Sequence, residues 1–353
     1  MVDSKKRQAN FELLRIVAML MVITLHYLTK GGVVISYAQN NSFINCVACF
    51  IQAFATVAVN VYILISGYFL VDKEFKVGRV ITLICQVLFY SYFVMIVLAV
   101  LGIVDMSTWS FYDLLVVIFP ILMEQYWFAT AYVVMALFGP VVAVGIKHID
   151  KSQLQLVIGS LLVLFSVGKT IIPVNLTTDN YGYDYGWFLC LFLIAGYIKM
   201  YGIPFFSSMK KSFLIYVLCS ICIFVAGIMV GILVRVTGSF SEYQNSVYHY
   251  NYILVLISAI ALFYGFSFIK IKEGLFSKVI IKIAPFTFGV YLLHEHIAVR
   301  DIWSNWLQVE KYKDSLLFIP HMIFCVIVIF CIGILVDYVR QWFFVFVKEK
   351  LPH

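Results

Sequence analysis

Ten apolar stretches, each about 20 residues long, decide what this chain can fold into, because that is the length an α-helix needs to cross a hydrocarbon core of about 30 Å. Hydrophobic residues make up 63% of the chain and charged residues only 12%, against roughly 25% charged residues in a soluble domain. The sequence therefore predicts an all-α, polytopic membrane protein with a single integral-membrane domain over residues 1–353 and no appended soluble domain. The expected spans are 10–29, 43–70, 78–103, 125–146, 154–172, 185–200, 213–235, 249–269, 282–298 and 316–344.

Lysine and arginine are distributed unevenly between these spans. If the N-terminus is cytoplasmic, eighteen of the 25 Lys and Arg residues fall in cytoplasmic segments, six fall in outer loops, and Arg15 alone lies within a span. An excess of positive charge on the cytoplasmic side is the usual sign of orientation. We therefore expect both termini in the cytoplasm and a multi-pass protein of the plasma (inner) membrane. The shorter aromatic segment 109–122, broken by Pro120, is interpreted as interfacial or re-entrant.

The first span carries two ionisable residues on one face. Arg15 and His26 are eleven residues apart, so they return to nearly the same helical face, about 16 Å apart along the axis. Ionisable side chains inside a span are costly and usually face protein or a water-filled cavity. Arg15 near the cytoplasmic surface suits a phosphate-bearing ligand, and His26, deeper in the membrane, could act as a general base. The alternatives are a snorkelling arginine and a packed histidine.

Further charged residues surround the cytoplasmic end of this stripe. Glu12 precedes Arg15 by three residues, so it can orient or neutralise the guanidinium, and we place it with His26 among the candidate catalytic residues. The loop after the second span adds three cations that could bind the same anionic cofactor: Lys73, Lys76 and Arg79. Ordinary positive-inside orientation is the alternative explanation for these cations.

Two outer loops, 173–187 and 236–252, are rich in Tyr, Asn and Asp. Aromatic rings can stack on the C–H faces of a sugar, while amide and carboxylate groups pair with its hydroxyls. Interfacial aromatic belts are the alternative explanation. We expect this side of the protein to bind a carbohydrate acceptor. The candidate contacts at the starts of the adjoining spans are Tyr126, Trp127, Asp184 and Trp187.

The His-Glu-His triplet at 294–296 is the densest group of metal-ligand side chains in the sequence. Its alternation along the chain suits neither a shared helical face nor a complete zinc ligand set. The sequence also lacks a Gly-rich phosphate loop and a Gly-x-Ser-x-Gly elbow. We therefore expect no metal, and we expect one residue of the triplet to contribute to the acceptor site.

Four motifs together resemble the integral-membrane acyltransferase-3 family, whose ten-helix members transfer acyl groups, often acetyl, from acyl-CoA to sugars of cell-surface polysaccharides. The resemblance spans nearly the whole chain. The motifs are Arg15-x10-His26 within LLRIVAMLMVITLHY, LISGYFL followed by basic residues at 76 and 79, YWFATAYVVMALFGPVV at 126–142, and TFGVYLLHEH at 287–296.

The resemblance implies a role for each matching residue. It makes His26 the catalytic histidine, Arg15 a cofactor-side residue and His294 the favoured member of the triplet for the acceptor site. It also places Lys76 and Arg79 near the phosphates of CoA. The family often has Arg-x-x-Arg where this chain has Lys76-x-x-Arg79, so bidentate phosphate binding at the first position is not expected.

The leading hypothesis is an O-acyltransferase, most simply an O-acetyltransferase. It would move the acyl group from cytoplasmic acetyl-CoA or another acyl-CoA to a hydroxyl of a cell-surface or lipid-linked carbohydrate, either directly or through an acyl-histidine. The alternatives are a transporter or flippase for a lipid-linked sugar or small anion, and a glycan polymerase. The expected partners are the carbohydrate acceptor and membrane lipids. The net charge of +7 reflects orientation and not nucleic-acid binding, and a homodimer is compatible with the sequence.

Overall fold

The computed structural model describes residues 7–173 and 180–350, and within these ranges the chain contains helices and no strands. Residues 174–179 of the predicted sugar-binding loop, and the basic residues Lys5 and Lys6, lie outside the described residues. A tenth apolar helix, α9 (Tyr185–Tyr201), is shorter than the nine described stretches that are long and apolar enough to cross a membrane. These nine are Ala9–Lys30, Phe43–Leu70, Val77–Val100, Trp127–His148, Lys151–Ile171, Met209–Thr237, Ser241–Ser267, Leu275–His294 and Phe318–Phe346. The prediction of an all-α polytopic membrane protein is confirmed.

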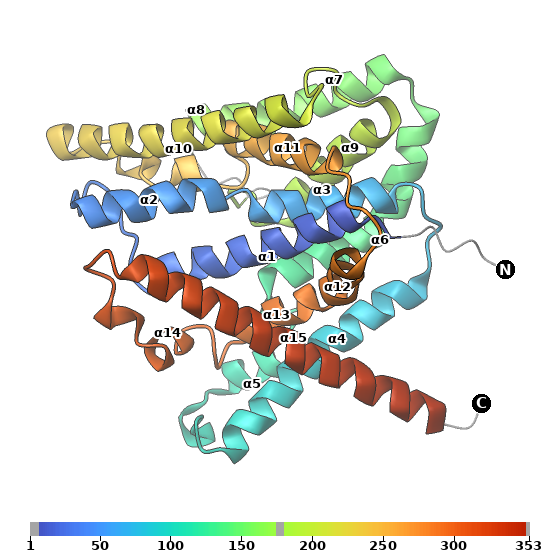
Figure 1. The fold of residues 1–353 in the computed structure, drawn as a ribbon, viewed down its shortest axis with the longest axis vertical. Helices are drawn as coiled ribbons and strands as arrows, with labels where there is room; N and C mark the ends of the chain where they lie inside the picture. The colour runs from blue at the N-terminus through green and yellow to red at the C-terminus, as the bar shows by residue number, and fades with distance from the viewer. Residues whose placement is uncertain (1–6, 174–179, 351–353) are drawn as a thin grey trace.

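Helix α1 (Ala9–Lys30) lies in the middle of the bundle (Figure 1). It packs against α3 (Ala58–Leu70), α11 (Ile253–Ser267), α13 (Thr287–His294) and α15 (Phe318–Lys350). Its first turn contains an acidic residue and its last turn a basic one, which is the arrangement that the helix dipole favours. The candidate stripe of α1 is therefore held by protein over much of its length.

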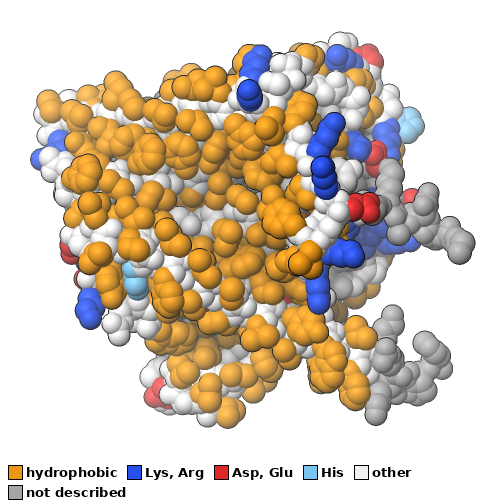
Figure 2. Space-filling view, in the orientation of Figure 1, with side chains coloured by type: hydrophobic (Ala, Val, Ile, Leu, Met, Phe, Trp, Pro, Cys, Tyr) orange, Lys and Arg blue, Asp and Glu red, His pale blue; other side chains and the backbone are white. Residues whose placement is uncertain are grey.

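The peripheral helices present apolar side chains outward. They include α4 (Val77–Val100), α6 (Trp127–His148), α7 (Lys151–Leu162) and α10 (Met209–Thr237), and their exposed residues are mostly Val, Leu, Ile and Phe. Figure 2 shows hydrophobic side chains over most of one face, with Lys and Arg gathered toward the edge where Figure 1 places both chain ends. This distribution suits a protein surrounded by lipid and ending in a charged cytoplasmic surface.

Two apolar stretches that read as continuous in the sequence are broken in the structure. The stretch 43–70 divides into α2 (Phe43–Ala55) and α3, and Thr56 at the break donates a hydrogen bond to Tyr248 O, 2.9 Å away. The stretch 275–294 divides into α12 (Leu275–Ile283) and α13 at a 3₁₀ turn that contains Pro285. Non-helical backbone at membrane depth requires protein or cavity around it.

The remaining helices are short. Helix α5 (Phe111–Ile118) has eight residues, about 12 Å of helix, so it is too short to cross the hydrocarbon core. Its N-terminus is fixed by a capping box in which the side chains of Ser110 and Asp113 bond each other's backbone N–H. Helices α8 (Gly168–Ile171) and α14 (Trp303–Trp306) each form a single turn.

Candidate active site

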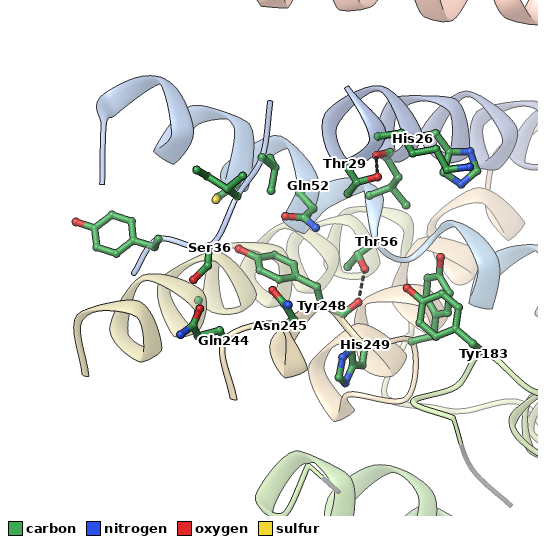
Figure 3. A pocket seen from close by; sticks show the side chains of 18 of the residues that line it. His26, Thr29, Ser36, Gln52, Thr56, Tyr183, Gln244, Asn245, Tyr248 and His249 are labelled. Atoms are coloured by element: carbon green, nitrogen blue, oxygen red, sulfur yellow. Dashed lines mark hydrogen bonds between the residues drawn. The ribbon is translucent and has the colours of Figure 1, made fainter. Parts of the chain in front are cut away.

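A chamber of about 820 Å³ lies at the end of α1 that is predicted to face outward. Figure 3 shows His26 toward one end of it, with Ser36 and Gln244 toward the other. Hydroxyl and amide side chains line it: Thr29, Ser36, Gln39, Gln52, Thr56, Gln244 and Asn245. Aromatic side chains complete the wall: Tyr37, Trp127, Tyr183, Tyr248 and Tyr250. Both polar outer loops contribute described residues to this wall, so the chamber combines ring faces with hydrogen-bonding groups.

The charges of this outer chamber are arranged in pairs. Lys30 Nζ contacts Glu295 Oε1, and Arg300 Nε lies 3.5 Å from Asp301 Oδ2. Each cation therefore has an acidic neighbour within the same chamber. The outer chamber carries little net charge for a ligand to balance.

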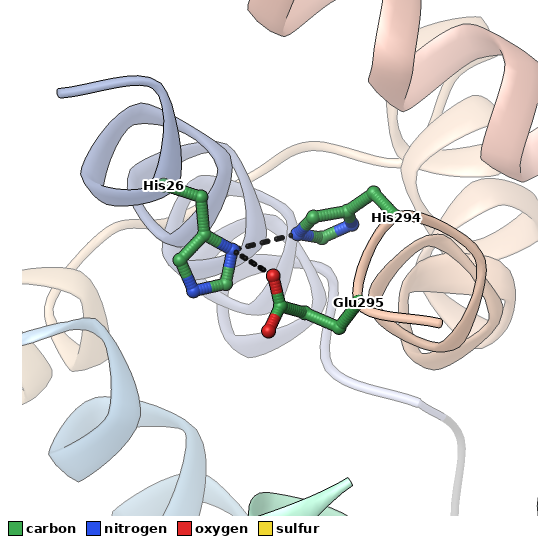
Figure 4. Close-up of side chains that lie close together, drawn as sticks. All are labelled: His26, His294 and Glu295. Atoms are coloured by element: carbon green, nitrogen blue, oxygen red, sulfur yellow. Dashed lines mark hydrogen bonds and ion pairs between the residues drawn. The ribbon is translucent and has the colours of Figure 1, made fainter. Parts of the chain in front are cut away.

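His26 is joined to the two residues that end α13. Its Nδ1 lies 2.9 Å from Nε2 of His294 and 3.1 Å from Oε1 of Glu295 (Figure 4). His294 and Glu295 are buried, 3% and 7% exposed. His296 points elsewhere, with its Nε2 3.0 Å from Ser91 O. The first two residues of the triplet therefore meet the histidine of α1, and the third does not.

The hydrogen bonds determine which nitrogen of each neutral ring carries the proton. His294 Nδ1 lies 2.6 Å from Val290 O, and because a carbonyl can only accept, this nitrogen must donate. Nε2 of His294 then carries a lone pair and accepts from Nδ1–H of His26, which also faces the Glu295 carboxylate. In neutral His26 the remaining nitrogen, Nε2, therefore has a free lone pair. This is the form of histidine that can take a proton.

His26, His294 and Glu295 also each offer one metal-ligand atom, and these atoms lie within 4.8 Å of one another. The outward nitrogen of His294 is held by a backbone carbonyl, as is common for metal-bound histidines. Lys30, however, contacts the same carboxylate oxygen, so its ammonium opposes a second cation there. The expectation that the protein uses no metal stays a prediction.

A second, smaller cavity of about 30 Å³ lies on the side of His26 that is predicted to face the cytoplasm. We call it the inner chamber. It shares Leu25, His26, Trp127 and Tyr250 with the outer chamber. Its other lining residues are Met19, Val22, Val59, Tyr62, Phe128 and Tyr291. His26 therefore stands at the boundary between a large polar chamber and a small, mainly apolar one.

Arg15 contacts Tyr62, a lining residue of the inner chamber, from the side that is predicted to be cytoplasmic. Its guanidinium carbon lies 5.7 Å from the centroid of the Tyr62 ring, within cation–π range. Its Nη1 lies 3.6 Å from Oε2 of Glu12, while its buried Nε has no hydrogen-bond partner among the described residues. Arg15 thus contacts a tyrosine that lines the inner chamber together with His26. Glu12 accompanies Arg15 and lies about 21 Å along α1 from His26.

The three predicted basic residues of the cytoplasmic loop meet at one small pocket. Lys73, Lys76 and Arg79 line a cavity of about 60 Å³ together with Phe192 of α9. Burial, followed by the positive charges of Arg79 and Arg15, lowers the pKa of Lys73. The positive charge of Arg15 therefore acts on this loop. These cations meet on the side of the protein that is predicted to be cytoplasmic, and such a group could bind an anionic ligand.

The other predicted acceptor residues have different environments. Trp127 lines both chambers. Tyr126 is buried and lines neither of them. Asp184 caps α9 by accepting from Trp187 N at 2.9 Å, and the buried Trp187 donates from Nε1 to Asn60 Oδ1 at 3.0 Å. The structure does not bring these last three residues to the outer chamber, and their role in substrate binding stays a prediction.

Sequence reasoning missed Glu295, Lys30 and Tyr62. Lys30 follows His26 by one helical turn on the same face, so the spacing alone predicts that the two side chains are neighbours. Glu295 was part of the conspicuous His-Glu-His triplet but was not assigned to His26. The contact between Glu295 and His26 depends on how α13 packs against α1, and the periodicity of a single segment does not reveal that packing.

Comparison with known proteins supplies an independent result. Residues 8–338 match the acyltransferase-3 family, described as an acyltransferase domain. Searches of curated proteins and of solved structures found no match. The family match covers the described helices up to most of α15, and it favours the enzyme hypothesis over the transporter, flippase and polymerase alternatives.

Proposed function

Because the chain belongs to the acyltransferase-3 family and is therefore a membrane acyltransferase, we propose that it moves an acetyl group from cytoplasmic acetyl-CoA to a hydroxyl of a carbohydrate. The proposed location is the plasma (inner) membrane, with the acceptor, cell-surface or lipid-linked, entering from the outer side. His26 is the general base.

One observation carries this proposal: His26 stands between the two chambers with a free Nε2. An acyltransferase of this kind must bring a thioester from one side of the membrane to a hydroxyl on the other. A base at the boundary of the two chambers is within reach of both substrates. Its Nδ1–H is held by His294 and Glu295, which fixes the tautomer that the reaction needs.

The reaction follows from this placement. The acceptor hydroxyl oxygen attacks the thioester carbonyl carbon while His26 Nε2 removes the hydroxyl proton. The C–O bond forms and the carbonyl electrons move to oxygen. When this intermediate collapses, the C–S bond breaks and the CoA thiolate takes the proton back from His26. The imidazolium formed between these steps is stabilised by the carboxylate of Glu295.

The donor side supports CoA and a short acyl group. Lys73, Lys76 and Arg79 can bind its phosphates, and Arg15 stands between that loop and the inner chamber. The inner chamber has a volume of about 30 Å³, and a cavity that holds one buried water needs roughly 10–15 Å³. This space suits the methyl of an acetyl group better than a long acyl chain.

The acceptor side supports a carbohydrate without net charge. The outer chamber offers five aromatic rings and seven hydroxyl or amide side chains, the groups that bind sugar faces and hydroxyls. Its lysine and arginine both have acidic neighbours. A strongly anionic sugar would therefore have to compete with Glu295 and Asp301 for these cations.

The test is an acetyl-transfer assay on purified protein in nanodiscs, with radiolabelled acetyl-CoA and a panel of neutral oligosaccharides. His26→Gln should lower kcat about 10² to 10⁴-fold, the usual contribution of a general base. His148→Gln is the matched control, because His148 is exposed and bonds only the backbone of its own helix among the described residues. If the wild type shows no transfer and no thioester hydrolysis above the level of His26→Gln, the proposal is overturned.

A further inference from the structure

Tyr291 has a buried hydroxyl whose O–H proton has no acceptor among the described residues. The side chain comes from α13, is 5% exposed and lines the inner chamber together with His26. Leaving a buried hydroxyl unpaired is unfavourable, so such a group in a native structure requires an explanation. A hydroxyl without a partner beside a reactive histidine can donate to a substrate.

The N-terminus of α6 lies at the same chamber. Its first two residues, Trp127 and Phe128, are part of the chamber wall. The side chain at the cap position, Tyr126, makes no capping hydrogen bond. The first N–H groups of a helix lack partners within the helix, and the dipole makes this end positive. The inner chamber therefore combines a positive helix end with a free O–H donor.

Acyl transfer requires this combination. When a hydroxyl attacks a thioester, the carbonyl oxygen becomes negatively charged, and preorganised donors aimed at that oxygen are usually the largest source of rate enhancement. We propose that the Tyr291 hydroxyl, beside the positive end of α6, donates to this oxyanion. Tyr291 is then a catalytic residue of the acetyl transfer. This inference rests on the proposed function, which assigns no residue to the oxyanion.

The placement of Tyr291 on α13 supports this assignment. Tyr291 precedes His294 by three residues and Glu295 by four, so all three lie on one side of the helix end. His294 and Glu295 hold Nδ1 of His26. One helix therefore orients the base and presents the oxyanion donor, and the attacked carbonyl lies between them in the inner chamber.

During the step, the Tyr291 O–H stays intact and no proton leaves it. The hydroxyl oxygen of the acceptor forms a bond to the carbonyl carbon, its proton goes to His26 Nε2, and the carbonyl π electrons become a lone pair on oxygen. Tyr291 donates a hydrogen bond to that oxygen until the C–S bond breaks. The donor is therefore needed in the transition state and much less in the ground state.

The experiment compares Tyr291→Phe with wild type in the acetyl-transfer assay, because this change removes only the hydroxyl. The expected result is a loss of about 10² to 10³-fold in kcat, with the KM for acetyl-CoA within about threefold. The control is Tyr216→Phe. Tyr216 is also buried, but its hydroxyl donates to Phe54 O, 2.9 Å away, and it lines neither chamber. This control should keep wild-type kcat.

The outcomes are distinguishable. A Tyr291→Phe protein with wild-type kcat would overturn the oxyanion assignment and leave the proposed function intact. A loss of activity accompanied by a lower thermal transition or by weaker acetyl-CoA binding, measured on the same nanodisc sample, would also overturn it, since a packing role explains that result. A wild type that does not transfer acetyl would overturn both proposals together.

Discussion

Nε2 of His294 lies 2.9 Å from Nδ1 of His26, although 268 residues separate them in the chain. The contact joins α1 to the end of α13 and leaves the opposite nitrogen of His26 free on the side of the chambers. Because the Val290 carbonyl sets the tautomer of His294 and this contact then sets the tautomer of His26, the chemistry of α1 depends on α13. The following predictions test separate parts of this arrangement.

Replacing Glu295 with Gln should lower kcat about 10² to 10⁴-fold. The amide has no charge to stabilise the imidazolium, and its NH₂ can donate to Nδ1 of His26 and so favour the wrong tautomer. The measurement is the initial rate of acetyl transfer at saturating acetyl-CoA. Glu310→Gln is the control, because Glu310 is exposed and pairs with Lys313 away from both chambers. Wild-type kcat in Glu295→Gln would contradict this role.

The donor site should weaken at alkaline pH through Lys73. Burial and the neighbouring Arg79 and Arg15 lower its pKa, so Lys73 is charged below this lowered pKa and loses its proton before the ordinary lysine value of about 10.4 is reached. Losing one charged hydrogen bond to a phosphate should raise the KM for acetyl-CoA about tenfold. The experiment measures this KM across the alkaline range.

Lys73→Arg provides the matched variant, because a guanidinium stays charged over that whole range. Its KM for acetyl-CoA should therefore remain flat where that of wild type rises. An equal alkaline rise in both proteins would show that another group is responsible.

Part of the site was predictable because it is local. The eleven-residue spacing of Arg15 and His26 places both on one face of a helix. In the structure Arg15 contacts Tyr62, which lines the inner chamber together with His26. The basic residues of the first cytoplasmic loop were likewise expected to form a cationic site, and they line one pocket. Periodicity and loop charge are properties of a single segment, so they can be read without tertiary structure.

The remainder depends on packing between distant segments. Glu295 contacts His26 because α13 ends against α1, and nothing in either segment alone specifies this. Asp184 and Trp187 resembled sugar-binding residues, but an acidic residue just before a helix is also a typical N-cap, and Asp184 takes this position in α9. The helix breaks near Thr56 and Pro285 were hidden within continuous apolar stretches.

In the outer chamber, Gln52 is positioned to accept a hydrogen bond from a hydroxyl of the carbohydrate. This side chain lines the chamber, and its Oε1 is buried without a hydrogen-bond partner in the described structure. Gln52→Met preserves size and removes the acceptor atom, so the KM for the carbohydrate should rise about 5 to 10-fold at nearly constant kcat. Gln155→Met, on the exposed surface of α7, should leave this KM unchanged. An unchanged KM in Gln52→Met would exclude Gln52 from acceptor binding.

The contribution of the packing between α13 and α15 to stability can be tested at Gly289. A Cβ added there would lie 2.4 Å from Oδ1 of Asp337. Asp337 is fully buried and accepts hydrogen bonds from Tyr90 OH at 2.9 Å and from Arg340 Nε at 2.7 Å. Gly289→Ala must therefore displace a buried, hydrogen-bonded carboxylate, at a cost of about 1–3 kcal/mol. We expect a clearly lower thermal transition in detergent, with activity lost at lower temperature because α13 carries His294.

Gly159→Ala is the control, since nothing lies within 4 Å of the added Cβ, and in a helix interior this change should stabilise by about 0.5–1 kcal/mol. Equal transitions for the two variants would mean that Asp337 accommodates the added methyl without cost.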